Sequence, residues 1–299
     1  MELFQGTGTA LITPFKQDGS VDFSALEKLI EYQIQNGTDA LISLGTTGEA
    51  STLTHSEKEQ VIRFTKKVIN GRVQFIVGAG SNCTATACEY VELAQKEGAE
   101  AILAVTPYYN KCTQNGVVEY YKSLRKVTSL PIIAYNVPGR TGVNILPETF
   151  IKAVKEGAVN AIKEASGNMS QITEVASLIQ SEVPDKAVLY SGDDGLTLPT
   201  LAVGGKGIIS VLANPAPKAM SLLTKAFFSG DMEKARKMQL SIMPLVKALF
   251  CEVNPTPVKA ACAMLSICEN VLRSPLLPLE ERNTEKLQKA LNDVLSIKE

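Results

Sequence analysis

A lysine closes a short apolar run in VNAIKEASGN, residues 159–168. As a strand, this run places Ala161, Lys163 and Ala165 on one face, because side chains alternate along a strand. The small neighbours leave room for the amine, and burial lowers the pKa of a lysine. A partly neutral amine can attack a ketone and form a Schiff base. An ion pair, or a lysine that snorkels at a strand end, is the alternative interpretation.

Two further side chains can assist such an amine. Tyr135 follows the apolar residues of PIIAYNV, the run before Lys163. Adjacent parallel strands lie about 4.8 Å apart, so the phenol can reach the lysine and exchange protons with it or with a substrate. Arg140, in PGRTG, can bind a carboxylate or a phosphate bidentately. A core tyrosine and a surface loop arginine are the alternatives at these two positions.

The sequence GTTGE, residues 45–49, ends another apolar run and enters a turn. Its backbone amides and the hydroxyls of Thr46 and Thr47 can hold a carboxylate. It is not a P-loop, because no GK[ST] follows. A plain glycine turn with hydroxyl caps is an equally good interpretation.

Other polar residues have structural interpretations. Asp193 or Asp194, in SGDDG, is expected to cap a helix N-terminus. This acidic pair would repel phosphate, and no histidine or third carboxylate accompanies it to bind a metal. His55 precedes a helical pattern and is expected to be a capping or surface residue. Lys259 follows two prolines at a helix start, where a structural or interface role is expected.

The bulk composition narrows the classes of function. The chain has 299 residues, with 30 basic and 31 acidic side chains, so no basic surplus indicates nucleic acid or an anionic membrane as a partner. No stretch approaches the ~20 apolar residues of a spanning helix, and the N-terminus lacks the pattern of a signal peptide. A cytoplasmic protein is therefore expected. The six cysteines form no CxxC pair and are expected to be free thiols. A single histidine argues against a metal site or a Ser-His-Asp triad.

Eight short apolar runs recur along the chain and suit buried parallel strands. They cover residues 8–15, 40–45, 75–80, 101–107, 131–137, 160–166, 187–192 and 207–213. Helical patterns lie between them, as at 22–37, 54–71 and 84–98. Eight such βα units predict an α/β fold, a (β/α)8 TIM barrel, whose active site lies at the C-terminal ends of the strands. A doubly wound open sheet would show fewer units and a glycine fingerprint after the first strand.

After residue 230 the strand patterns stop and three helical patterns follow. We therefore expect a catalytic barrel over residues 1–230 and a C-terminal helical region over 231–299, packed on the barrel.

The motifs, taken together, resemble the dihydrodipicolinate synthase family of pyruvate-dependent aldolases, which also include N-acetylneuraminate lyase. GTTGE, TPYYN, YNVPGRTG, IKEASGN, SGDD and NPTPVK stand in the family's order. Each motif is weak alone, and the six together span nearly the whole chain. The resemblance implies a barrel with a helical C-terminal region, a homotetramer of tight dimers, and condensation of pyruvate with aspartate semialdehyde.

The resemblance also implies roles for individual residues. Lys163 matches the lysine that forms the imine, and Tyr135 the tyrosine that relays protons to the intermediate. Thr47 matches the threonine that links this tyrosine to a second tyrosine. Tyr109 matches that second tyrosine, which a neighbouring subunit supplies. The remaining matches are pocket positions: Thr46 beside Thr47, Arg140 for the semialdehyde carboxylate, and Ile209, whose backbone faces pyruvate. Imine chemistry of this kind implies no cofactor and no metal.

Regulated members of the family bind lysine at the tight-dimer interface. The matching positions are Ser51, His55, Lys58, Asn82, Thr86 and Tyr108. Thr86 stands where sensitive members often carry glutamate, and Lys58 stands where many carry histidine and would repel a cationic effector. Weak or absent inhibition by lysine is therefore expected.

Two other functions remain open. A sister aldolase would cleave a sugar acid to pyruvate, although GRTG at the entrance suits a short substrate that ends in a carboxylate. A non-catalytic binding protein on a retained barrel would bind its ligand without an imine, and would have no need of the lysine, the two tyrosines and the threonine together.

Overall fold

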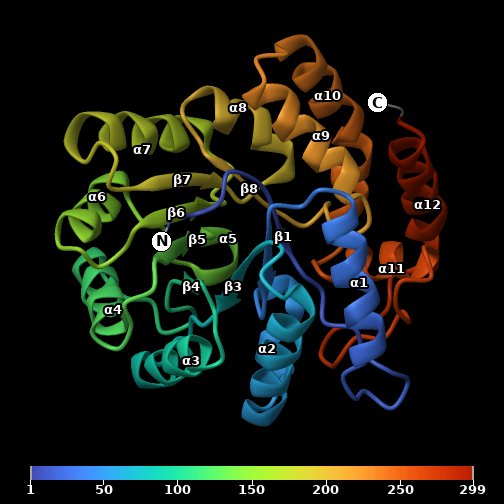
Figure 1. Cartoon of the computed structure of the whole chain (residues 1–299), viewed down its shortest axis with the longest axis horizontal. Helices are drawn as coiled ribbons and strands as arrows, with labels where there is room; N and C mark the ends of the chain where they lie inside the picture. The colour runs from blue at the N-terminus through green and yellow to red at the C-terminus, as the bar shows by residue number, and fades with distance from the viewer. Residues whose placement is uncertain (1, 298–299) are drawn as a thin grey trace.

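The computed structural model describes residues 2–297, which form a closed barrel of parallel strands inside a ring of helices (Figure 1). Each strand pairs with the next, and β8 pairs with β1 to close the sheet. The strands are β1 Gly6–Ala10, β2 Ala40–Ser43, β3 Gln74–Gly78, β4 Ala101–Val105, β5 Ile132–Asn136, β6 Ala161–Glu164, β7 Val188–Ser191 and β8 Gly207–Ser210. The predicted TIM barrel is confirmed, and all eight apolar runs contribute a strand.

Helices follow the strands and cover the outside of the barrel. They are α1 Phe23–Gln35, α2 His55–Ile69, α3 Thr84–Lys96, α4 Gln114–Lys126, α5 Pro138–Thr141, α6 Pro147–Lys155, α7 Met169–Glu182, α8 Thr197–Ala202 and α9 Pro217–Phe228. Three short 3-10 turns, η1 Thr46–Gly48, η2 Ala50–Thr52 and η3 Asp194–Leu196, lie at strand ends. The helices predicted at 22–37, 54–71 and 84–98 are confirmed as α1, α2 and α3.

The start of α2 shows how local sequence sets an element boundary. The Thr54 side chain accepts a hydrogen bond from the Glu57 amide, and Glu57 in turn accepts from the Thr54 amide. This reciprocal capping box satisfies two amides that the first helical turn leaves unpaired. His55, the first residue of the helix, is exposed and its ring stacks near Tyr90. It is therefore a surface residue, while Thr54 is the cap.

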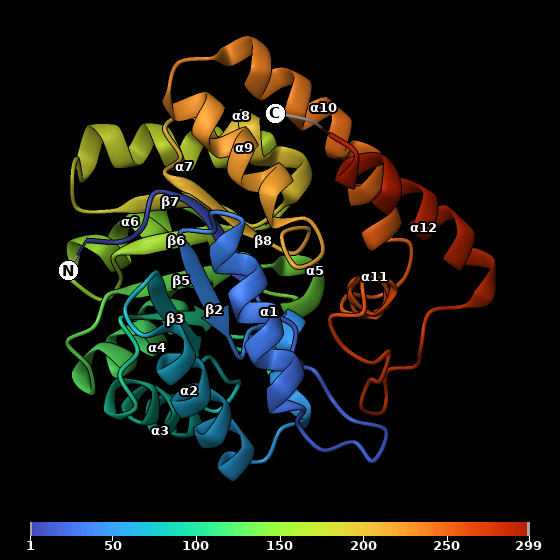
Figure 2. The same ribbon diagram turned by 45° about the vertical axis from the view of Figure 1, so that its right-hand side comes forward.

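The C-terminal region contains the three expected helices, α10 Met232–Leu249, α11 Thr256–Met264 and α12 Glu281–Leu295. Figure 2 shows them on one flank of the barrel, with α10 beside α9 and α12 beside α10. Buried residues of α10 and α12, such as Ile242 and Leu287, belong to the same hydrophobic core as the barrel helices. The division into domains at residue 230 stays a prediction.

A second, smaller core fills the inside of the barrel. At the N-terminal end of the strands, Tyr190 stacks on Phe4 with 4.5 Å between ring centroids and donates a hydrogen bond to the Phe4 carbonyl. Ile209 lies in this inner core and is fully buried. The apolar filling closes one end of the barrel, which leaves the C-terminal end of the strands for polar side chains.

Candidate active site

Lys163 is the buried amine at the C-terminal end of the barrel. It lies on β6, where it pairs in register with Tyr135 on β5 and with Tyr190 on β7. Its side chain is only 4% exposed, and Nζ lies 4.3 Å from the centroid of the Tyr135 ring. The structure therefore brings together the lysine and the tyrosine that the sequence singled out.

Gly192 provides much of the space around this lysine. A Cβ atom at Gly192 would lie 3.0 Å from Lys163 Cε and 2.7 Å from Ala165 Cβ. Real side chains do not tolerate such contacts, so only glycine fits beside the lysine here. The sequence indicated the small neighbours on the same strand, but not this glycine at the end of β7.

Thr46 and Thr47 lie on the turn η1, which follows β2. Thr47 is buried, and its Oγ1 accepts a hydrogen bond of 3.0 Å from Asn254 Nδ2. Thr13 Oγ1 donates to the carbonyl of Gly48, at 2.7 Å, and ties the same turn to the end of β1. The GTTGE loop is thus a fixed wall of the site.

Glu49 ends this turn in a left-handed conformation, with φ at 52°. Its carboxylate accepts a 2.6 Å hydrogen bond from Lys259 Nζ, and both side chains are almost fully buried. The second carboxylate oxygen accepts from the amide of Arg273. Burial lowers the pKa of Lys259, and the adjacent Glu49 carboxylate opposes that change. The expected structural role of Lys259 is confirmed, because it anchors the loop that carries the two threonines.

Arg140 lies on the short helix α5, directly after β5. Its Nη2 donates a 3.0 Å hydrogen bond to the carbonyl of Asn254. Arg140, Lys163, Tyr135, Thr46 and Thr47 all line one cavity of about 470 Å³. Lys247, Phe250 and Asn254 of the C-terminal region complete its wall. The cavity is large enough for two small acids and places an arginine, a lysine and hydroxyl groups around them.

Two predicted site residues do not line this cavity. Ile209 lies in the inner core of the barrel. Tyr109 is 90% exposed on the loop after β4, in a left-handed conformation with φ at 70°. Its expected contribution to a neighbouring subunit stays a prediction.

The residues expected to bind an effector separate into two groups. Ser51, Lys58, Thr86 and Tyr108 line a second cavity of about 540 Å³. His55 and Asn82 are not in its wall. The second cavity shares Thr46, Tyr135 and Arg140 with the first, so the two spaces adjoin. Lys58 Nζ lies 3.9 Å above the Tyr90 ring, which places a positive charge at this site.

One residue of the acidic pair after β7 has the capping role that the sequence predicted. Asp193 caps η3 by accepting from the Gly195 amide at 2.8 Å, and it also reaches the wall of the first cavity. Asp194 is fully buried and accepts hydrogen bonds from Ser210 Oγ and from the Leu212 amide. Burial raises the pKa of Asp194, and these hydrogen bonds act against the rise. Within residues 2–297, no group of three His, Cys, Asp or Glu side chains is placed to hold a metal ion.

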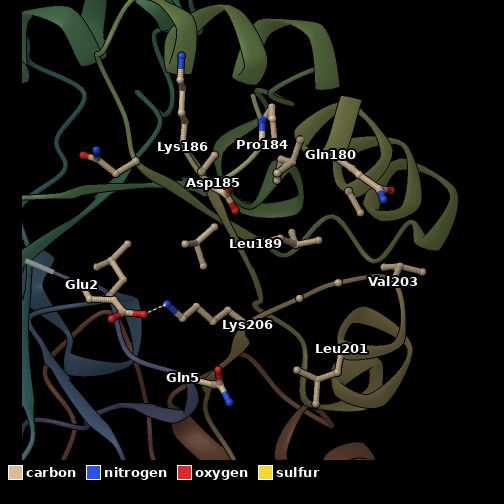
Figure 3. A pocket seen from close by; sticks show the side chains of 18 of the residues that line it. Glu2, Gln5, Gln180, Pro184, Asp185, Lys186, Leu189, Leu201, Val203 and Lys206 are labelled. Carbon is tan, nitrogen blue, oxygen red and sulfur yellow. Dashed lines mark hydrogen bonds and ion pairs between the residues drawn. The ribbon is translucent and has the colours of Figure 1, made fainter. Parts of the chain in front are cut away.

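Another cavity, of about 1070 Å³, lies at the opposite end of the barrel (Figure 3). Residues of α7, α8 and the start of β7 line it, and the lining mixes apolar side chains such as Leu189 and Leu201 with polar ones such as Gln180. Lys206 reaches Glu2 here and forms a 2.8 Å ion pair. The N-terminal end of a TIM barrel normally serves stability, and the candidate catalytic side chains line the cavity at the other end.

Comparison with known proteins identifies the family. The model of the Dihydrodipicolinate synthetase family matches residues 3–294. The chain belongs to this family.

Named relatives agree with that assignment. The 4-hydroxy-tetrahydrodipicolinate synthase of Alkaliphilus oremlandii is 50% identical over 285 residues, which cover 95% of this chain and 97% of the relative. The solved dihydrodipicolinate synthase of Thermotoga maritima superposes with a TM-score of 0.95 at 44% identity, covering 98% of this chain and 99% of that one. A monomeric dihydrodipicolinate synthase variant gives the same TM-score and identity, over 98% of each chain. The expected activity, that of a 4-hydroxy-tetrahydrodipicolinate synthase and thus a lyase of lysine and diaminopimelate biosynthesis, is confirmed.

Two further expectations concern the whole chain. All six cysteines are free thiols, as predicted. Among the described residues, no helix is both long and apolar enough to span a bilayer.

Proposed function

We propose that the chain condenses pyruvate with L-aspartate 4-semialdehyde through a covalent imine on Lys163. The observation that carries this proposal is the position of Lys163, buried in the barrel mouth with Nζ 4.3 Å from the Tyr135 ring centroid. No other lysine lies on a strand of the described barrel. A buried amine beside a phenol and two threonine hydroxyls suits nucleophilic attack with proton exchange.

The chemistry follows from the imine. The Lys163 amine attacks the ketone carbon of pyruvate, and water leaves as the carbon–nitrogen double bond forms. The protonated imine draws electrons from the pyruvate methyl, which loses a proton to give an enamine. The enamine carbon attacks the aldehyde carbon of the second substrate, and the new alkoxide takes up a proton. Attack on the imine carbon, by the substrate amino group or by water, releases Lys163.

The other residues divide the remaining tasks. Tyr135 is the proton relay, because its ring lies against the amine. Thr47 extends the relay, and Arg140 binds the carboxylate of the semialdehyde from the entrance. The Thr46 hydroxyl and the backbone at Ile209 are assigned to pyruvate. No cofactor is required, because the imine itself is the electron sink, and activity is expected to survive dialysis against a chelator.

The proposal includes a second copy of the chain. Tyr109, 90% exposed and strained into the left-handed region, is well placed to leave its own barrel and complete a neighbouring site. We therefore assign a homotetramer of tight dimers. Light scattering after gel filtration tests this assignment. The cytoplasmic location also stays part of the proposal, and cell fractionation tests it.

Trapping the imine is the direct test. Borohydride reduction with pyruvate is expected to add one pyruvate-derived group to Lys163, located by peptide mass spectrometry. Lys163→Ala should give no adduct and no condensation. Lys247→Ala is the matched control, since Lys247 lines the same cavity but should not carry the adduct. Full condensation activity in Lys163→Ala would refute the mechanism.

The sugar-acid aldolase is distinguished by substrate. A coupled assay with pyruvate and aspartate semialdehyde should show turnover, while keto-deoxy sugar acids should release little pyruvate. The reverse preference would favour the sister activity and would leave the Lys163 imine in place.

A further inference from the structure

Asn254 brings the C-terminal region into contact with the active site. It lies between α10 and α11, far from the barrel strands in sequence, yet it lines the cavity that contains Lys163. The residue is only 5% exposed. From the sequence it is only the first residue of the NPTPVK motif, and no role is assigned to it.

Asn254 makes two contacts with predicted site residues, through different parts of the residue. Its side-chain Nδ2 donates to Thr47 Oγ1 at 3.0 Å. Its backbone carbonyl accepts from Arg140 Nη2 at 3.0 Å. A change of side chain at this position therefore removes the contact with Thr47 and leaves the acceptor for Arg140 in place.

The other end of the Asn254 amide has no partner. Oδ1 is buried and accepts no hydrogen bond among the described residues. A buried amide with one end unpaired is a poor contributor to stability, because the desolvation of the unpaired atom costs about as much as a hydrogen bond gains. Such a group calls for a functional explanation.

The chemistry of the amide fixes the direction of the hydrogen bond with Thr47. Nδ2 carries hydrogens and no lone pair for acceptance, so Thr47 Oγ1 must be the acceptor. The hydroxyl hydrogen of Thr47 is then free to point at a different acceptor. Thr47 lines the same cavity as Lys163 and Tyr135, so this hydrogen can serve an acceptor within that cavity.

We propose that Asn254 is a positioning residue that holds the Thr47 hydroxyl as a hydrogen-bond donor toward the reacting groups. This role rests on the proposed function of Thr47 in the proton relay. It also gives the C-terminal helical region a part in the reaction, since the orienting amide comes from outside the barrel.

The test separates kcat from KM. Asn254→Asp keeps the size of the side chain but replaces the donor by acceptors, which would take the Thr47 hydrogen for themselves. We expect kcat to fall about tenfold, as for the loss of one neutral hydrogen bond. The KM for aspartate semialdehyde should stay within about twofold, because the backbone contact with Arg140 is kept. Asn254→Ala should show the same split.

A double-substitution cycle tests the route of the effect. Thr47→Val alone should also lower kcat, and Asn254→Ala in that background should cause little further loss, because residues in one network are not additive. Asn292→Asp, an exposed site on α12, is the control for added charge. Additive losses, an unchanged kcat, or a raised KM for the semialdehyde with kcat intact would overturn the proposal. Failure of both Asn254 variants to fold would overturn it too, since Asn254 would then be a structural residue.

The imine assay keeps this result distinct from that of the proposed function. Borohydride trapping of pyruvate on Lys163 should persist in the Asn254 variants. If the parent chain shows no adduct, the proposed function fails. If the parent shows the adduct and the cycle is additive, only the role of Asn254 fails.

Discussion

Replacing Lys259 by methionine is expected to destabilise the protein strongly without touching a reacting group. Lys259 Nζ lies 2.6 Å from Glu49 Oε1, with the two side chains 0% and 1% exposed, and 3.9 Å above the Phe15 ring. Methionine keeps the length and much of the packing of the lysine stem. The change therefore mainly removes the positive charge that compensates the buried Glu49 carboxylate.

The expected magnitude follows from that burial. Removing one partner of a buried pair costs about 3–5 kcal/mol, because the other charge is left without compensation. An unfolding entropy of roughly 2.1 cal/mol/K per residue gives about 0.6 kcal/mol/K for 299 residues. The loss should thus lower the Tm by about 5–8 °C. The amide of Arg273, which also donates to Glu49, keeps the cost from exceeding this range.

Calorimetry of a matched set measures the effect. Glu49→Gln combined with Lys259→Met removes both charges and should recover most of the lost Tm, since an uncharged pair carries no buried ion. Lys289→Met, at an exposed position on α12, should leave the Tm unchanged. A Tm within about 1 °C of the parent for Lys259→Met, or a double variant with the summed losses of both singles, would refute the reasoning.

Three further outcomes are expected. Hydrogen bonds from Arg273 lower the pKa of Glu57 to about 2. The stability gained from this depressed pKa is therefore present above about pH 4.5 and lost as the pH falls toward 2. In acid-unfolding curves the gap between the parent and Glu57→Gln should close across that window, and a constant gap would contradict it. Gly192→Ala should lower kcat at least tenfold and also lower the Tm, because its methyl would lie 3.0 Å from Lys163 Cε and 2.7 Å from Ala165 Cβ; full activity would disprove the steric argument. Lysine should inhibit weakly or not at all, since Lys58 places a positive charge in the second cavity, and strong inhibition at sub-millimolar lysine would count against this.

Much of the barrel was predictable because its strands are buried on both faces. A strand covered by helices outside and by the inner core inside must be apolar along its length, so eight short apolar runs indicated eight strands. Alternation then indicated that Lys163 faces inward, and chain order placed Tyr135 on the neighbouring strand. Both inferences use only local geometry, which a sequence carries directly.

The roles of single glycines and of loops were harder to predict from the sequence. The space around Lys163 depends on Gly192 of the next strand, whose backbone comes within contact distance only when the barrel closes. The exposure of Tyr109 likewise depends on how its loop leaves the barrel. A sequence pattern records which residues are apolar, not which backbones approach one another.

The sequence by itself determined the fold class, the family, and the candidate lysine and tyrosine that meet at the barrel mouth. Only the tertiary structure decided what holds the site in place. Asn254 meets Thr47, and Lys259 meets Glu49, across 207 and 210 residues of chain. Contacts at such separations arise because the C-terminal helices pack against the open end of the barrel. No periodicity or spacing along the chain encodes which of their side chains will arrive there.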